Sequence, residues 1–300
     1  MLKRVGLTAF DFFLYMTVVL AWGFAWIGIH FQVGVVSPEV SILWRFLFAG
    51  AVMLAIAWWR GDRMRFALQE HLSFAMLGLM MFCLNFLLFY HAAATLPSGL
   101  LSIVFSLASF MNVWLGAIFL RAPIDRRVAL GGLLGAFGMV AMFYPQVAGA
   151  EFKRGAVIAL VLCVIGTLAF CLGNMVSARL QRRGIPVFAA TGYAMLYGSA
   201  ALAIYAAANR HPFIIDGSPA YVISLVYLAL IGSVVAFACY LTLLGRIGAD
   251  RAAYATVLGP VVALVVSTLV ENFQWSIAAA IGLAAVLIGN LLVLRPAKKA

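Results

Sequence analysis

Residues 244–293 read LGRIGADRAAYATVLGPVVALVVSTLVENFQWSIAAAIGLAAVLIGNLLV and contain two apolar runs, at roughly 251–270 and 275–294. A short basic turn precedes the first run, and a short polar turn separates the two. An α-helix rises 1.5 Å per residue, so about twenty apolar residues cross the hydrocarbon core of a bilayer, which is about 30 Å thick. Each run therefore predicts a membrane-spanning helix.

The rest of the chain repeats this pattern. Of the 300 residues, 66% are hydrophobic and 10% are charged, and the mean hydropathy is +1.11. A soluble domain carries about 25% charged residues, so this composition excludes a soluble fold. We predict an all-α integral membrane protein with ten transmembrane helices. The expected spans are roughly 12–31, 38–59, 71–93, 98–120, 128–147, 155–178, 186–208, 219–245, 251–270 and 275–294.

The basic residues predict how the chain is oriented in the membrane. Of the 20 Lys and Arg residues, sixteen fall on one side of the predicted spans, three on the other, and Arg45 lies within a span. Cytoplasmic loops carry the excess of Lys and Arg, so we predict cytoplasmic N- and C-termini and an even number of spans. This placement in short loops accounts for the net charge of +11, and we predict no nucleic-acid partner.

Ten spans divide into two sets of five. A repeat with an odd number of spans inserts in opposite orientations in its two copies, as in many transporters. At an offset of 150 residues, Tyr90 matches Tyr240, and Gly132 and Leu133 match Gly282 and Leu283. We predict two inverted five-helix repeats, at 1–147 and 155–294, and a cytoplasmic tail at 295–300.

Residues 90–142 and 240–294 resemble the drug/metabolite transporter superfamily, with EamA-type repeats. The second repeat carries the pattern best, with its basic turn, a small-residue helix containing Pro260, Glu271 at the end of that helix, and a glycine-spaced last helix. The first repeat departs from it, with Phe110 where the proline falls and Arg121 where the acidic residue falls. The segments FYHAAATLPSGLLSIVFSLASF (89–110) and AWGFAWIGIHF (21–31) are most similar to the YddG-type exporters of aromatic amino acids. This resemblance implies a transporter of small molecules.

The predicted ninth span contains a proline deep inside a helix, Pro260. Proline lacks an amide hydrogen and its ring presses on the carbonyl four residues earlier, which belongs to Thr256. A freed carbonyl in hydrocarbon is tolerated where a neighbouring helix or a water-filled cavity satisfies it. We expect Thr256 to face substrate and Gly259 and Pro260 to act as a hinge. A purely structural kink is the alternative.

Two tryptophans of the first span are further candidates for the substrate site. Trp22 and Trp26 are one helical turn apart and share a face, and Trp26 is too far along the span to anchor at the cytoplasmic interface. A cavity-lining indole ring can stack on an aromatic substrate or attract its ammonium group. Packing or lipid-facing aromatic residues are the alternative.

Polar residues inside apolar spans complete the predicted substrate site. Polar side chains are costly in hydrocarbon, so they mark either cavities or hydrogen bonds between helices. Both roles stay open, as does close packing for the serines. The candidates are Asn85, Tyr90 and His91 in the third span, Ser102 and Ser106 on one face of the fourth, and Asn174 in the sixth, with Asn112 interpreted in the same way.

Charge is sparse within the predicted spans. All nine acidic residues fall at helix ends or in loops. Arg45 lies about 10 Å inside the outer end of its helix by the helical rise, where it can snorkel to the interface or pair with Glu39. This distribution favours a small neutral or zwitterionic substrate with apolar bulk. The four cysteines and four histidines have no metal, redox or catalytic spacing, so we predict no metal, no cofactor and no enzymatic activity.

These features together predict a transporter of the cell inner membrane that exports neutral amino acids, aromatic ones prominently, by alternating access. An exporter of hydrophobic drugs or other small metabolites is the alternative. The partners are the substrate and the lipid bilayer. Gly131 and Gly135 form a small-xxx-small pair that suits either dimerisation or packing between the two repeats, and we expect a monomer.

Overall fold

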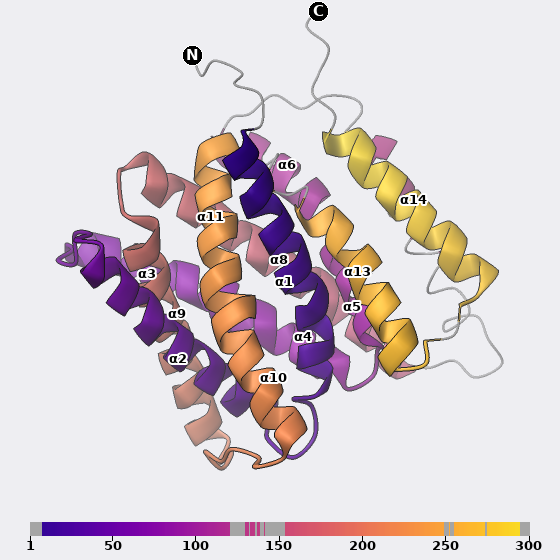
Figure 1. Ribbon diagram of the computed structural model, residues 1–300, viewed down its shortest axis with the longest axis horizontal. Coiled ribbons are helices and arrows are strands. Elements are labelled where there is room, and N and C mark those ends of the chain that lie inside the picture. The colour runs from indigo at the N-terminus through magenta and orange to yellow at the C-terminus, as the bar shows by residue number, and fades with distance from the viewer. Residues whose placement is uncertain are drawn as a thin grey trace, which may run out of the picture.

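The computed structural model describes residues 8–120, 130, 131, 133–135, 137, 138, 141, 154–248, 252, 255–273 and 275–294. These residues fold into a bundle of helices, with no strand among them (Figure 1). The helices of the first half are α1 (Ala9–His30), α2 (Pro38–Trp59), α3 (Leu68–Leu77), η1 (Gly78–Leu84), α4 (Asn85–Ala93), α5 (Ser98–Phe105) and α6 (Ala108–Leu120). Those of the second half are α8 (Arg154–Arg182), α9 (Val187–Ala208), α10 (Pro219–Ala229), η2 (Leu230–Val235), α11 (Ala236–Ile247), α13 (Ala255–Val270) and α14 (Ile277–Leu294).

Seven continuous helical segments of the described chain are long and apolar enough to cross a membrane. They coincide with the predicted spans one to four and six to eight. The ninth and tenth predicted spans correspond to α13 and α14, whose apolar stretches, 258–270 and 277–289, are shorter. Most of the fifth, at 128–147, lies outside the described residues. The all-α membrane fold is therefore confirmed, and the count of ten stays a prediction.

The outside of the bundle is apolar. A soluble protein rarely exposes large contiguous apolar surfaces to water, whereas a membrane protein exposes them to the apolar lipid tails. Here aliphatic and aromatic side chains from most helices face outward, among them Leu20, Phe24, Phe48, Ile204, Ile223, Leu269 and Ile288. The polar side chains Asn85, Asn112, Asn174 and Arg45 are instead buried between helices. This distribution, with apolar side chains outside and polar side chains between the helices, is that of a multi-pass membrane protein.

Two spans contain a π-helical segment at corresponding places. In η1 and η2 the helix widens, and such π-bulges disturb the regular backbone hydrogen bonding and are frequent at functional sites. η1 ends six residues before Tyr90, and η2 ends five residues before Tyr240. Both tyrosines are fully buried. The two halves of the chain thus place the same irregularity and the same side chain in their third spans.

Glycines allow the closest helix contacts. A Cβ added at Gly78 of η1 would lie 2.2 Å from the carbonyl oxygen of Ala194 in α9, and one added at Gly23 would lie 2.6 Å from Val262 in α13. A Cβ at Gly289 of α14 would lie 2.5 Å from the Gly131 carbonyl oxygen and 2.9 Å from the Gly135 nitrogen. The Gly131 and Gly135 pair therefore packs against the last helix of the same chain.

The start of α1 and the end of α14 lie at one end of the bundle, and the end of α13 and the start of α14 lie at the other (Figure 1). α1 packs between α11 and α13, and α8 packs against α4 and α6. α2 and α9 pack against each other. Between the helices lies a central space lined by residues of α1, α2, α4, α5, α8 and α11.

Candidate substrate site

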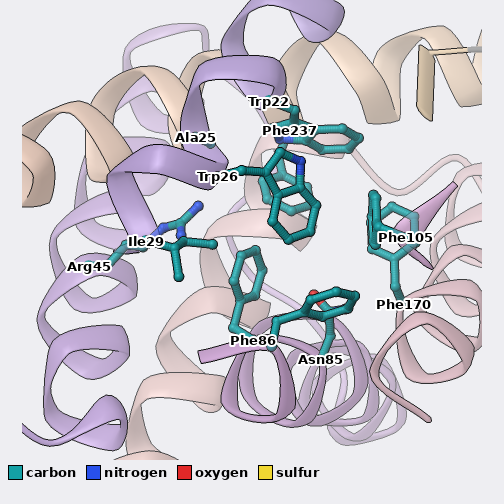
Figure 2. Close-up of a pocket in the computed structure, with 11 residues that line it drawn as sticks. Trp22, Ala25, Trp26, Ile29, Arg45, Asn85, Phe86, Phe105, Phe170 and Phe237 are labelled. Atoms are coloured by element: carbon teal, nitrogen blue, oxygen red, sulfur yellow. The ribbon is translucent and has the colours of Figure 1, made fainter. Parts of the chain in front are cut away.

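A small cavity of about 30 Å³ lies at this centre (Figure 2). Ligand pockets are commonly about 300–1,000 Å³, so the side chains around this space must move apart to admit a small molecule. Its wall is mostly aromatic and carries two polar side chains. The lining residues are Trp22, Ala25, Trp26, Ile29, Arg45, Asn85, Phe86, Phe89, Phe105, Phe170 and Phe237. We call this space the chamber.

α1 supplies both tryptophans of the chamber wall. The Trp22 ring lies against Tyr240 and Phe237, with centroid distances of 4.9 and 5.2 Å, and its Nε1 donates to the carbonyl oxygen of Gly232 at 3.2 Å. The Trp26 ring lies 5.2 Å from Phe89 and 5.5 Å from Phe105. Tilted and edge-to-face contacts of this kind are favourable between aromatic rings. They hold both indoles in fixed positions on the wall.

Arg45 lies in the chamber wall, where the sequence led us to expect a residue that snorkels or pairs with Glu39. Its side chain is 1% exposed, and its Nε donates to the Ser233 hydroxyl at 2.9 Å. The guanidinium carbon sits 4.5 Å from the Phe86 ring centroid and 5.0 Å from that of Phe46. Nη1 has no hydrogen-bond partner. The expectation was wrong because helix packing directs the side chain inward, away from the interface.

Glu39 instead pairs with a predicted site residue, His91, and this pair lies outside the chamber wall. The Nε2 atom of His91 and Oε1 of Glu39 are 3.1 Å apart, and the His91 side chain is half exposed. The neighbouring Tyr90 is fully buried, and its hydroxyl donates to Oε1 of Gln32 at 3.0 Å. Tyr90 also lies close enough to Arg45 to interact with it electrostatically.

Two asparagines and a tyrosine form a second buried polar cluster. Nδ2 of Asn174 donates to Oδ1 of Asn112 at 3.2 Å and to the Tyr240 hydroxyl at 3.0 Å. Nδ2 of Asn112 and Oδ1 of Asn174 have no partner. Asn174 is therefore near the chamber through Tyr240, whose ring contacts Trp22 and Phe170, but it does not line it.

Asn85 lines the chamber and also joins two helices. Its Nδ2 donates to the carbonyl oxygen of Gly166 in α8 at 2.9 Å, so both roles that the sequence left open are realised. The hydroxyls of the two predicted serines donate to backbone carbonyls three residues earlier in the chain. Ser102 donates to the Gly99 carbonyl and Ser106 to the Ile103 carbonyl, each at 2.6 Å, and neither residue lines the chamber.

The predicted hinge lies in α13. Pro260 is inside this helix, and a Cβ on Gly259 would meet nothing within 4 Å. The side chain of Thr256 lies outside the described part of the structure. Among the described residues, no group of His, Cys, Asp and Glu is arranged to hold a metal ion.

Of the predicted site residues, Trp22, Trp26 and Asn85 line the chamber. Five others do not line it: Tyr90, His91, Ser102, Ser106 and Asn174. Sequence reasoning missed the phenylalanines and Arg45. For Arg45 a signal existed, because an ionisable residue inside an apolar span marks a functional site by default. For the phenylalanines no such signal existed in a chain with 23 of them.

Comparison with known proteins agrees with this architecture. The model of the EamA-like transporter family matches residues 10–144 and matches again at 153–295. The chain belongs to this family. EamA proteins are transporters, and the double match corresponds to the two halves of the chain.

Among relatives of this EamA protein, YyaM of Bacillus subtilis, an uncharacterised transporter, is 26% identical over 81% of this chain and 82% of its own length. A probable amino-acid metabolite efflux pump of Escherichia coli is 22% identical, covering 66% of this chain and 65% of the pump. PagO of Salmonella typhimurium is 30% identical over 31% of each chain. One solved structure shares the fold, with a TM-score of 0.68 at 19% identity, covering 94% of this chain and 95% of the other.

Proposed function

We propose that this EamA-family transporter exports neutral amino acids, aromatic ones prominently, by alternating access. The single observation that carries the proposal is the chamber, whose wall consists mostly of aromatic side chains together with one guanidinium and one amide. Two tryptophans and five phenylalanines line it. Such a wall stacks on an aromatic ring, and the indoles also attract an ammonium group.

Alternating access is supported by equivalent contacts of the two halves. α1 packs against α11 and α13, and its counterpart α8 packs against α4 and α6. Under an inverted repeat these are the same contacts seen from opposite sides of the membrane. We infer ten spans arranged as repeats 1–147 and 155–294, in the cell inner membrane, with both termini cytoplasmic.

The inferred oligomeric state is a monomer. The glycine faces of Gly131 and Gly135 and of Gly289 are used within one chain, so they are not free to dimerise. The similarity to a probable amino-acid metabolite efflux pump favours amino acids among possible substrates.

The second candidate is an exporter of hydrophobic drugs or other small metabolites. The apolar lining favours it, because aromatic walls bind apolar molecules of many shapes. Purified protein reconstituted in liposomes separates the two. Labelled L-phenylalanine and L-tryptophan should move faster than glycine and faster than a quaternary ammonium dye. Movement of the dye without movement of any amino acid would replace the proposal with the second candidate.

A further inference from the structure

Arg45 is a buried positive charge whose neighbours supply no negative charge. In the described part of the chain, the carboxylates are engaged elsewhere. Asp11 pairs with Arg246, Glu39 with His91, Asp62 with Arg60, Glu70 with Arg63 and Glu271 with His30, and Asp216 is bonded to Ser218. Ser233, Tyr90, Phe46 and Phe86 are neutral partners of the guanidinium. A charge buried in this way is costly until it is paired.

The guanidinium is held by neutral groups, and one of its nitrogens is left unpaired. The Nε of Arg45 donates to the Ser233 hydroxyl. The guanidinium carbon also lies 5.0 Å from the Phe46 ring centroid and 4.5 Å from that of Phe86, as cation–π contacts. Nη1 is buried and has no hydrogen-bond partner. Arg45 also lines the chamber, and Figure 2 shows its guanidinium at one edge of the space that the aromatic rings enclose. An arginine held in this way is pre-organised for a planar anion such as a carboxylate.

We propose that Arg45 binds the carboxylate of the transported molecule, and that a carboxylate, not an amino group, is the charged group that the chamber requires. This rests on the proposed function, in that it concerns the same chamber. Among the lining residues there is no acidic side chain to pair with an ammonium group. Asn85 has donated its Nδ2 to Gly166 and offers an amide oxygen, which is a weaker, uncharged acceptor for an amino group.

The substrate class that follows is small monocarboxylates with an aromatic or bulky apolar group. Aromatic amino acids belong to it, and so do the hydroxy acids, 2-oxo acids and deaminated acids with the same side chains. Amines and amides that lack the carboxylate do not. An uncharged apolar drug would leave the Arg45 charge unpaired in the occupied chamber, so it would bind poorly despite the aromatic wall.

The first test uses the wild-type protein in lipid nanodiscs and needs no variant. L-phenylalanine, 3-phenylpropionate, phenethylamine and L-phenylalaninamide are each titrated while tryptophan fluorescence and the melting temperature are recorded. We expect 3-phenylpropionate to bind within a few-fold of L-phenylalanine, and the two ligands without a carboxylate to bind at least tenfold more weakly, because a charged hydrogen bond is lost. Equal binding of phenethylamine and 3-phenylpropionate would overturn the proposal.

The second test assigns the effect to Arg45. Arg45→Gln should lower the affinity for L-phenylalanine and 3-phenylpropionate at least tenfold and abolish the preference over phenethylamine, while Arg45→Lys should retain part of that preference. Arg60→Gln is the matched control, since Arg60 also lies over a phenylalanine ring, Phe188, but is half exposed outside the chamber. An unchanged preference in folded Arg45→Gln would contradict the assignment. If that variant does not fold, the ligand series on the wild-type protein decides.

The outcomes separate this inference from the proposed function. If 3-phenylpropionate binds through Arg45 but no amino acid binds or moves, the carboxylate inference stands and amino-acid export falls. If L-phenylalanine is transported but phenethylamine competes with it equally, amino-acid export stands and the carboxylate inference falls.

Discussion

At the residue scale, Trp22 connects the chamber wall to the irregular backbone behind it. Its ring forms part of the wall, and its Nε1 donates to the carbonyl oxygen of Gly232, inside the π-helical segment η2. Backbone carbonyls that a widened helix turn leaves without a good partner are costly in a membrane interior. Trp22 therefore stabilises η2 while it shapes the chamber.

We predict that Trp22→Phe keeps an aromatic ring in the wall but removes this hydrogen bond. The free energy of unfolding should fall by about 1 kcal/mol, the usual net contribution of one hydrogen bond, and thermal unfolding in detergent measures it. Leu20→Phe is a control, since Leu20 is on the same helix and faces outward. Equal stability of wild type and Trp22→Phe would show that the hydrogen bond contributes nothing.

At the element scale, helices cross most closely where glycines meet backbone. Gly78 of η1 faces Ala194 and Gly198 of α9, and a Cβ there would lie 2.2 Å from the Ala194 carbonyl oxygen and 2.9 Å from the Gly198 nitrogen. Backbone atoms cannot move aside as a flexible side chain can. Contacts through small residues let membrane helices approach in this way.

Gly78→Ala should therefore push η1 and α9 apart. We expect a loss of stability of at least about 1–3 kcal/mol, as for overpacked cores, seen as a lower melting temperature and less monodisperse protein in detergent. Gly116→Ala is the matched control, because Gly116 is also helical and a Cβ there meets nothing within 4 Å. Equal behaviour of the two variants would refute close packing at this crossing.

The proline of α13 belongs to the same scale. Pro260→Ala restores the backbone hydrogen bond to the Thr256 carbonyl, so the helix should become stiffer and no less stable. If α13 bends during transport, turnover should slow while substrate affinity stays unchanged. Thr256→Val removes only the hydroxyl, and should weaken affinity by roughly 1 kcal/mol if that hydroxyl contacts substrate. Wild-type transport by both variants, normalised to folded protein, would leave the proline as a packing feature.

At the scale of the whole molecule, ion pairs join helices at both ends of the bundle. At the predicted cytoplasmic end, Nε of Arg246 in α11 lies 2.6 Å from Oδ1 of Asp11 in α1. At the opposite end, Glu271 after α13 lies 3.1 Å from Nδ1 of His30 and also accepts from the backbone nitrogen of Ser98. Alternating access requires such contacts to open in turn.

Asp11→Asn should favour opening at the cytoplasmic end. Because the Arg246 side chain is partly exposed, the pair stabilises the state that is closed at this end by about 1 kcal/mol at most. Losing it should therefore raise the ratio of open to closed protein by roughly fivefold at most. A cysteine replacing Ala25 of the chamber wall, in a background without native cysteines, should react several-fold faster with a thiol reagent in inside-out vesicles. Glu70→Gln, which breaks an exposed pair with Arg63, is the control and should leave the rate unchanged.

The predicted orientation has its own test. Cysteines placed beside Arg63, Arg126 and Arg182 should be shielded from an impermeant thiol reagent in intact cells, because these basic loops are predicted to face the cytoplasm. Cysteines near Pro97 and Asn272 should react. Labelling beside Arg126 from outside would invert the assignment of both membrane faces.

The amino-acid sequence by itself was enough to predict a helical membrane protein with two related halves. These features depend on the length of apolar runs and on residues repeated along the chain, which are local or periodic properties. The double family match agrees with them, as do the seven membrane-length helices found in the described part of the chain. The number of ten spans stays a prediction, because the fifth lies mostly outside the described residues.

The composition of the chamber was decided only by the tertiary structure. Arg45 and Ser233 are 188 residues apart, and Trp22 and Gly232 are 210 apart, so no local pattern shows that they meet. The serines illustrate the converse, because their hydroxyls bond to carbonyls three residues away and do not reach the chamber. In hydrocarbon a polar side chain must find a partner, and packing of distant helices determines whether that partner is its own backbone, another helix or a substrate.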